Sequence, residues 1–490
     1  MAFLAKLQKN FKVEAGSSNI FTNIAILSTK RPILHCNMSN NNMENGGARP
    51  LFTTRMGVIA TTVGSAVGLG NIWRFPYEAG VHGGGAFMML YIVFIIILGI
   101  PLITAEYALG RATHRGIFGV FRALKAHRAW NALGYMGVLS AMLILSFYSV
   151  VAGWTLEYFF GAVGGAYTDV SREGLHTVFD EFTSGWRPLM WTVLFLVMNY
   201  LIISRGVARG IERISNVLMP LLFALIIIFC INSLMLPDAA AGLAFLFKPD
   251  FSSLTAPVVI GAMGQAFFSL SLGLGCMLTY ASYFNERTNI VKSATTTAAL
   301  DTLIAVLAGV LIFPAVFSYG YSPEAGPKLV FEVLPAIFNQ MTGGSIWAAL
   351  FFFTLFIASL TSTISMCEIV VVFLCEEKKM KRRSACAVTI AVALVLGLLC
   401  AMSFGYFTGV ELPLIGHPDF FSWFDYGTSN ILLPLGGMLT SVFAGRVLDR
   451  KVFNRQITGS ERPSAVSRLI GFSLRYICPA LIAVIFIVNI

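Results

Sequence analysis

The chain has 490 residues, of which 57% are hydrophobic and 12% are charged, and its mean hydropathy is +0.77. An ordinary soluble domain, with about 45–50% apolar residues, is excluded. The formal net charge is +10, but the basic residues lie between apolar segments, where anionic lipid headgroups favour them. We therefore expect contact with membrane lipid and no nucleic-acid partner. The sequence leaves the oligomeric state open.

Eleven apolar segments are long enough to cross a bilayer, which needs about 20 residues per helix. Their predicted ranges are 55–80, 86–110, 132–160, 188–204, 211–236, 256–284, 294–319, 346–375, 384–405, 425–446 and 468–489. We predict one transmembrane domain over 49–490, with repeat one at 55–236, repeat two at 256–446 and an extra helix at 468–489. Residues 1–48 are polar and weakly patterned, and we expect a disordered or mis-assigned N-terminal extension.

Basic residues are concentrated in alternate intervals between these segments. The rich intervals are 111–128, 205–213, 287–292, 378–383 and 446–468, whereas the other intervals hold only Arg172, Arg187, Lys248 and Lys328. The positive-inside rule therefore predicts an inner N-terminus and an outer C-terminus. The long outer interval 161–187 contains neither Cys nor an Asn-x-Ser/Thr acceptor, which favours a bacterial inner membrane.

Two matched interruptions occur in the first and sixth segments. Residues 64–71 and 269–275 both contain Gly-Leu-Gly, and each Gly weakens a helix by about 1 kcal/mol relative to Ala. A single Gly commonly serves close helix packing. Two breaks five spans apart instead predict a 5+5 inverted repeat, in which the unwound segments face each other around a binding site. The expected fold is an all-α membrane protein with broken first and sixth helices.

The residues at these breaks suit charged ligands. Half-helix ends present free N–H and C=O groups, a combination that binds a zwitterion and a cation together. Asn71, Ser269 and Ser271 supply further oxygens for a sodium ion. The hydroxyl run 359–363 adds more, although such hydroxyls also often bond to their own helix. Acidic residues inside apolar segments are functional candidates because buried charge is costly; they are Glu106, Asp301 and Glu368.

Several motifs carry a family resemblance. They are GSAVGLGNIWRFPY at 64–77, GGGAF at 83–87, GIPL at 99–102 followed by Glu106, GQAFFSLS at 264–271 and TYASY at 279–283. Together they resemble the neurotransmitter:sodium symporter family over about residues 49–446. The resemblance implies the leucine-transporter fold and a bacterial symporter, in which sodium entry drives amino-acid import by alternating access.

The resemblance also implies two Na⁺ sites. The first would use the Ala66 carbonyl, Asn71, Ser269, Asp301 and the substrate carboxylate. The second would use the carbonyls of Gly64, Val67 and Ala358 and the hydroxyls of Thr361 and Ser362. Family members often have Asn at the position of Asp301, and many of these require chloride. Because a fixed carboxylate could replace that anion, we expect chloride not to be required.

The substrate pocket implied by the resemblance is largely apolar. It would be lined by Leu69, Gly70, Ile144, Tyr148, Val151, Phe268, Ser271, Leu274, Thr363 and Met366. Tyr148 would hydrogen-bond the substrate carboxylate. No acidic residue stands beside Ala66, where amine-transporting relatives have Asp, so an amino acid is favoured. We expect one with a hydrophobic or aromatic side chain.

Gates follow from the same resemblance. Arg74 would pair with Asp425 on the outer side, above a lid of Tyr148 and Phe268. On the inner side Arg49 would pair with Glu376, braced by Phe52 and Tyr283, although the family usually has Trp and Asp at two of these positions. Partly hydrated charge pairs suit gates because they exchange at little free-energy cost.

The fifth segment contains Gly210 and Pro220, which match a helix-unwinding motif of the family. Unwinding there would let water reach the second sodium, whereas the alternative is an ordinary cap and kink.

Other functions remain to be weighed. One alternative is a transporter of another small zwitterion. A channel is a further alternative, but it fits two broken helices less well. An intramembrane enzyme would need a catalytic pair, and no nucleophile, base and oxyanion group converge in one segment, so we predict that the chain is not an enzyme. Saturable flux that requires a sodium gradient and leaves the substrate unchanged would distinguish these classes.

Overall fold

The computed structural model describes residues 51–168, 170–323, 329–405 and 419–488. Within these ranges eight helices are long and apolar enough to cross a membrane, or up to ten if each bent helix pair is one span. The predicted all-α membrane class is confirmed. The count of eleven spans stays a prediction, because the sixth is formed by two short pieces. The predicted extension at 1–48 lies outside the described residues.

The predicted first repeat contains five spans. Their elements are α3 (Arg55–Ala66), η1 (Gly70–Arg74) and α4 (Phe75–Val81); α5 (Gly85–Phe94), η2 (Ile95–Gly99) and α6 (Ile100–Thr113); α8 (Asn131–Val163); α10 (Arg187–Ile203); and η4 (Val207–Glu212) with α11 (Arg213–Leu234). The three η elements named here are π-helical turns, and each of them continues directly into the next helix. The predicted segments overlap these elements and differ by a few residues at the ends.

The predicted second repeat and the extra helix follow. Their elements are α13 (Ala256–Ser269) and α14 (Cys276–Ala281); α15 (Ile290–Ser318); α17 (Gly344–Glu377); α18 (Arg382–Met402); α19 (Phe420–Tyr426), η7 (Gly427–Leu432), α20 (Leu433–Val442) and η8 (Phe443–Val447); and α22 (Ala465–Phe472), η9 (Ser473–Ile477) and α23 (Cys478–Val488).

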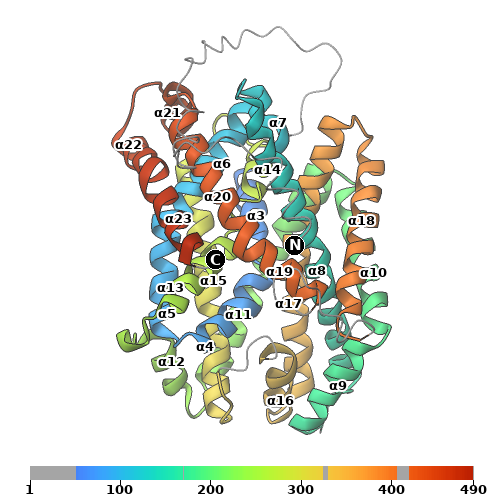
Figure 1. Cartoon of the computed structure of the whole chain (residues 1–490). Helices are drawn as coiled ribbons and strands as arrows, with labels where there is room; N and C mark the ends of the chain where they lie inside the picture. The colour runs from blue at the N-terminus through green and yellow to red at the C-terminus, as the bar shows by residue number, and fades with distance from the viewer. Residues whose placement is uncertain (1–50, 169, 324–328, 406–418, 489–490) are drawn as a thin grey trace, which may run out of the picture. The chain divides into compact units, whose positions relative to one another are not determined.

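Short helices lie at both ends of the bundle. Figure 1 shows α7 (Ile117–Ala123) and α21 (Arg450–Thr458) at one end. At the opposite end lie α9 (Arg172–Ser184), α12 (Ala239–Phe247) and α16 (Leu334–Asn339). The helices α7 and α21 belong to intervals that are rich in Lys and Arg, whereas α9, α12 and α16 belong to intervals that are poor in them. The basic intervals of the sequence therefore lie at one end of the bundle and the other intervals at the opposite end.

The long helices α8 and α17 form the centre of the bundle. They pack against each other, and α8 also contacts α10 and α18. The most apolar stretch of α17 is 100% buried and that of α8 is 78% buried, against 39% for α11 and for α18. A helix that is apolar on all sides belongs in the interior, and these two helices therefore form a fixed wall beside the broken ones.

Both predicted helix breaks are confirmed. The axes of α3 and of residues 70–81 differ by 49°. A Cβ atom at Gly68 would lie 2.3 Å from the Ser362 hydroxyl, so this close approach requires glycine. Between α13 and α14, Gly273 and Gly275 have φ of +82° and +78°, a left-handed conformation that favours glycine.

Glu106 supports the sixth-helix break. Its carboxylate accepts hydrogen bonds from the backbone N–H of Gly273 at 3.0 Å and of Leu278 at 3.2 Å. Unwound backbone inside a bilayer needs such partners because lipid offers none. The carboxyl that the sequence singled out in α6 therefore replaces helical hydrogen bonds that the break removes.

We expect Glu106→Ala to lower the melting temperature of the purified protein. Two buried N–H groups would lose their acceptor, at about 1–3 kcal/mol each. Thermal unfolding in detergent would measure the change, with the exposed Glu461→Ala as the control that keeps the wild-type value. Equal melting temperatures for both variants would show that Glu106 does not support the break.

Candidate substrate and ion site

The two helix breaks face each other. The Ser65 hydroxyl lies 2.8 Å from the Cys276 sulfur, and the Ser271 hydroxyl donates to the Ser65 carbonyl at 3.3 Å. The Gln265 side-chain amide donates to the Gly70 carbonyl at 2.7 Å. Polar groups of α13 and of the turn after it thus bind the unwound backbone of the first span, so that half-helix ends converge from both repeats.

A cluster of oxygens lies beside the first break. The Asn71 side-chain N–H₂ donates to the Ser269 hydroxyl at 2.9 Å and to the carbonyl and carboxylate of Asp301 at 3.0 and 2.8 Å. The Ser269 hydroxyl donates to the other carboxylate oxygen at 2.6 Å. Asp301 is fully buried. The structure thus brings together three side chains of the first predicted sodium site, and Ala66, the fourth protein residue, lines the adjacent cavity.

The chemistry of this cluster fits a hard cation. Its acceptors are carboxylate, carbonyl and hydroxyl oxygens, the ligands that hard metal ions prefer. The positively polarised Asn71 N–H₂ already lies among three of these oxygens at 3.0 Å or less. A buried carboxylate is costly without positive charge nearby, so the cluster favours a cation.

Tyr91 is a further member of the cluster. Its hydroxyl lies 3.1 Å from the Ser269 hydroxyl and donates to the Asp301 carboxylate at 3.3 Å. The sequence analysis missed this residue. It stands in an apolar run with no polar neighbour at helical spacing, and only the packing of α5 against α13 brings it to the site.

A second group of oxygens lies between α3 and α17. The Ser362 hydroxyl donates to the Val67 carbonyl at 3.1 Å, and the Thr361 hydroxyl donates to the Ala358 carbonyl at 3.1 Å. A Cβ atom at Gly64 would lie 3.5 Å from the Thr361 Cβ. The five residues of the second predicted site therefore meet where α3 ends.

A small cavity lies between the breaks. Its volume is about 10 Å³, and it is lined by Ala66, Gly68, Gly70, Ile144, Tyr148, Phe268, Ser271, Leu274, Ser362, Met366 and Leu433. This volume admits about one water molecule, so an amino acid would enter only if lining side chains moved apart. Most of the predicted pocket residues are here, and Leu433 of α20 is an addition that the sequence analysis missed.

Three predicted pocket residues are not among the lining residues. The Leu69 backbone N–H donates to the Tyr148 hydroxyl at 2.6 Å, so it lies directly beside the cavity. Val151 is fully buried within α8. Thr363 faces the other way, because its hydroxyl donates to the Asn199 side chain at 2.9 Å. Two residues along a helix correspond to a rotation of about 200°, which turns Thr363 away from the side that carries Thr361.

Arg74 lies above the cavity. Its guanidinium is 3.5 Å from the Asp425 carboxylate and 4.5 Å from the centre of the Phe268 ring, and it donates to the Ser429 hydroxyl at 2.9 Å. The structure thus brings together the residues of the predicted outer gate. It adds Glu78, one helical turn along, at 3.4 Å, which sequence analysis missed although the i,i+4 spacing was a signal for it.

The predicted inner pair is only partly described. Arg49 lies outside the described residues. The Glu376 carboxylate accepts the backbone N–H of Gly116, with oxygens at 3.2 and 3.3 Å. This contact ties the end of α17 to the beginning of α7, and the pairing of Glu376 with Arg49 stays a prediction.

The predicted brace beside this pair is present. The Phe52 backbone N–H donates to the Tyr283 carbonyl at 3.0 Å, and the two rings meet edge to face at 5.8 Å. The Tyr283 hydroxyl donates to the Glu368 carboxylate at 2.6 Å, and Arg382 pairs with the same carboxylate through two hydrogen bonds of 2.9 and 2.6 Å. The third intramembrane acid thus has a partner on α18.

The fifth-span pair is part of helical packing. Gly210 lies in η4, and a Cβ atom there would be 2.2 Å from the Ile202 carbonyl. Pro220 lies inside α11. The close approach accounts for the glycine, which fits the cap-and-kink interpretation; unwinding at this motif stays a prediction.

Paired helix breaks that enclose a small cavity and oxygen clusters, in a bundle of membrane-spanning helices, define the site of a secondary transporter. The model of the sodium:neurotransmitter symporter family matches residues 49–169 and 175–490. The chain belongs to this family. It is thus a multi-pass, sodium-dependent membrane transporter and not an enzyme.

Similar proteins agree with this assignment. A sodium-dependent transporter of Bacillus subtilis, YhdH, is 36% identical over 438 residues, which cover 89% of this chain and 96% of the relative. A sodium-dependent transporter of Haemophilus influenzae is 34% identical over 463 residues, covering 92% and 100%. The crystal structure of MhsT in complex with L-phenylalanine matches with a TM-score of 0.85 and 39% identity, covering 90% of this chain and 100% of that one.

His82 follows α4 and contacts the outer gate. Its ring Nδ1 lies 3.2 Å from the Glu78 carboxylate, and this hydrogen bond raises the pKa of His82 against the opposing effect of burial. An unfolded His has a pKa of about 6.5. The contact therefore stabilises the fold fully below about pH 6.5, and the contribution is lost as the pH rises through the raised pKa.

We expect His82→Gln to lower the melting temperature at pH 6 and to have little effect at pH 9, where the wild-type ring is neutral. Thermal unfolding of both proteins across this range would measure the difference. His127→Gln, at an exposed position, is the matched control. A loss of stability that is the same at both pH values would contradict the assigned proton linkage.

Proposed function

We propose that the protein is a sodium-driven symporter that imports an amino acid by alternating access across the inner membrane of a bacterium, with its N-terminus inside and its C-terminus outside. The observation that carries this proposal is the buried cluster of Asn71, Ser269 and Asp301 beside a cavity formed by two helix breaks. A cation in the cluster and a zwitterion in the cavity would lie close enough to stabilise each other, which couples the two fluxes.

The polar groups of the cavity support an amino acid as the substrate. The Tyr148 hydroxyl accepts the Leu69 N–H and keeps its own proton to donate to a carboxylate. The lining residues contain no Asp or Glu, so an amine that lacks its own carboxylate would find no protein anion there. Carbonyl groups at the half-helix ends would receive the ammonium group.

The apolar wall supports a hydrophobic or aromatic side chain. Ile144, Phe268, Leu274, Met366 and Leu433 contribute it from four different spans. The similarity to MhsT, whose structure contains L-phenylalanine, points in the same direction. The cavity would have to open by movement of these side chains, and another small zwitterion is the alternative substrate.

The two oxygen groups support two co-transported sodium ions. One would lie at Asp301 and the other between α3 and the Thr361 and Ser362 hydroxyls. The second site joins the broken span to the buried helix α17, so ion binding there would hold α3 in place. Release of the ion would then free α3 to move, which is what alternating access requires.

The buried carboxylate supports chloride-independent transport. Asp301 places one fixed negative charge beside the first site, where two cations and a zwitterion would otherwise leave uncompensated positive charge. A mobile anion would bring no further benefit there.

We expect gradient-driven uptake of a labelled amino acid by proteoliposomes, and we expect Asn71→Ala and Thr361→Ala to lose it at physiological sodium. Removing an oxygen that contacts an ion costs about 1.5–3 kcal/mol, which raises the half-saturating sodium concentration about tenfold or more. Ser359→Ala is the matched control, since its hydroxyl donates to the Leu355 carbonyl of its own helix and Ser359 belongs to neither proposed ion site. Wild-type sodium activation in both site variants would refute the assignment.

We expect chloride removal to leave wild-type uptake unchanged, because Asp301 supplies the negative charge. The variant Asp301→Asn should lose uptake without chloride and regain part of it when chloride is added. Uptake in gluconate and in chloride buffers, at equal sodium, would measure both effects. If chloride removal abolished wild-type uptake, the proposed role of Asp301 would be wrong.

A further inference from the structure

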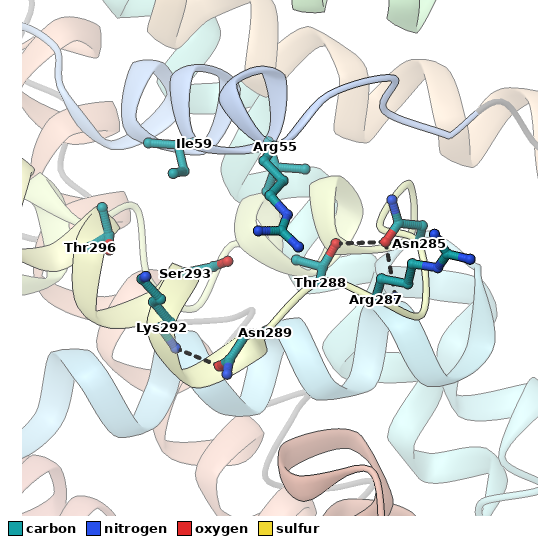
Figure 2. Close-up of a pocket in the computed structure, with 10 residues that line it drawn as sticks. Arg55, Ile59, Asn285, Arg287, Thr288, Asn289, Lys292, Ser293 and Thr296 are labelled. Carbon is teal, nitrogen blue, oxygen red and sulfur yellow. Dashed lines mark hydrogen bonds between the residues drawn. The ribbon is translucent and has the colours of Figure 1, made fainter.

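A larger cavity lies at the beginnings of α3 and α15, and none of its lining residues belongs to the site described above. Its volume is about 500 Å³. Figure 2 shows α3 on one side and the turn before α15 on the other. The lining residues are Arg55, Val58, Ile59, Asn285, Arg287, Thr288, Asn289, Lys292, Ser293 and Thr296.

The cavity concentrates positive charge. Arg55, Arg287 and Lys292 line it, and the ten lining residues include no Asp or Glu. Within the described part of the chain, none of the three has a carboxylate within 4.0 Å, whereas Arg74 has two and Arg382 has one. Three cations around one space, without an acidic partner among the described residues, favour an anionic ligand.

Two of the three cations lie in the first turns of helices. Arg55 is the first residue of α3 and Lys292 the third of α15, and neither helix has an acidic residue in its first turn. A helix N-terminus carries partial positive charge and favours anions, so cations at this position are unfavourable for the helix itself. The α3 N-terminus already has an anion beside it, because the Glu212 carboxylate accepts the Thr53 and Thr54 backbone N–H groups at 3.0 and 3.2 Å. The charge that favours a further anion is therefore that of the three cations lining the cavity.

The shape and the wall of the cavity suit a phosphate with apolar groups attached. In Figure 2 Arg55 points from α3 toward Thr288, and the Lys292 amine points toward α3. Hydroxyls of Ser293 and Thr296 supply further donors, while Val58 and Ile59 form an apolar side. Met56, next to Arg55, is a large apolar residue that is 56% exposed, as expected where a membrane protein meets lipid.

We propose that this cavity binds the phosphate-bearing headgroup of an anionic phospholipid. Arg55 and Lys292 hold the phosphate from α3 and α15, and the apolar side contacts the glycerol and the first part of the acyl chains. Such a lipid joins the first half of the broken span to the seventh. The proposal does not depend on which substrate the transporter carries.

The test measures lipid retention by the full-length protein with native mass spectrometry. Wild-type protein in detergent with equal phosphatidylglycerol and phosphatidylcholine should retain the anionic lipid preferentially. Arg55→Gln with Lys292→Gln should reduce that preference about tenfold or more. Arg128→Gln with Lys451→Gln removes the same charge from exposed positions outside the cavity and should preserve it.

Equal retention by the two double variants would overturn the proposal. If the first double variant did not fold, Lys292→Gln alone would serve, since its side chain is exposed, and unchanged preference would again overturn it. Millimolar inorganic phosphate distinguishes the source of the phosphate. It should fail to displace the lipid, and complete displacement would mean that the cavity takes free phosphate and that the lipid assignment is wrong.

Discussion

The structure depends on one constraint: backbone that leaves a helix inside a bilayer must find hydrogen-bond partners within the protein. The chain meets this constraint with side chains from distant elements. Tyr148 of α8 accepts the Leu69 N–H, and Asn71 accepts the Gly68 N–H at 2.9 Å. Glu106 performs the same role at the second break. Both breaks are therefore supported by hydrogen bonds from within the protein.

The same arrangement connects stability with transport. Tyr148, which supports the first break, also lines the cavity, so a movement of Tyr148 that opens the cavity would exchange its hydrogen bond to Leu69 for another. The packed pair α8 and α17 provides a fixed wall, while α3 is bound to it through hydroxyl groups such as that of Ser362. Weak, exchangeable contacts between a fixed helix and a broken one are suited to a protein that changes conformation in each cycle.

Much of the fold and of the candidate site could be predicted from the sequence because the signals are local. Apolar length gives the spans, and Gly-Leu-Gly in two of them gives the breaks. The roles of Asn71, Ser269 and Asp301 were inferred by family resemblance, and the structure brings these residues together. What the sequence analysis missed depends on packing between elements. Tyr91 reaches Asp301 only because α5 lies against α13, and Leu433 reaches the cavity from the tenth span.

The sequence analysis also could not establish which way a side chain points around the axis of its helix. The prediction places Thr363 in the substrate pocket and its neighbours Thr361 and Ser362 in the second sodium site, but the Thr363 hydroxyl contacts Asn199 on α10. Helical spacing alone does not fix which side of a fully buried helix faces a site. No sequence motif indicates the large basic cavity between α3 and α15. Its residues come from the beginnings of two helices that are more than two hundred residues apart in the chain.

The central claim is that one pair of helix breaks holds a sodium ion and a zwitterion in contact. Equilibrium binding of ²²Na⁺ to the purified protein, with and without a transported amino acid, tests it most directly. The account predicts that each ligand increases the affinity for the other by the same factor, as linkage requires. Sodium binding that is unchanged by saturating amino acid would contradict the account.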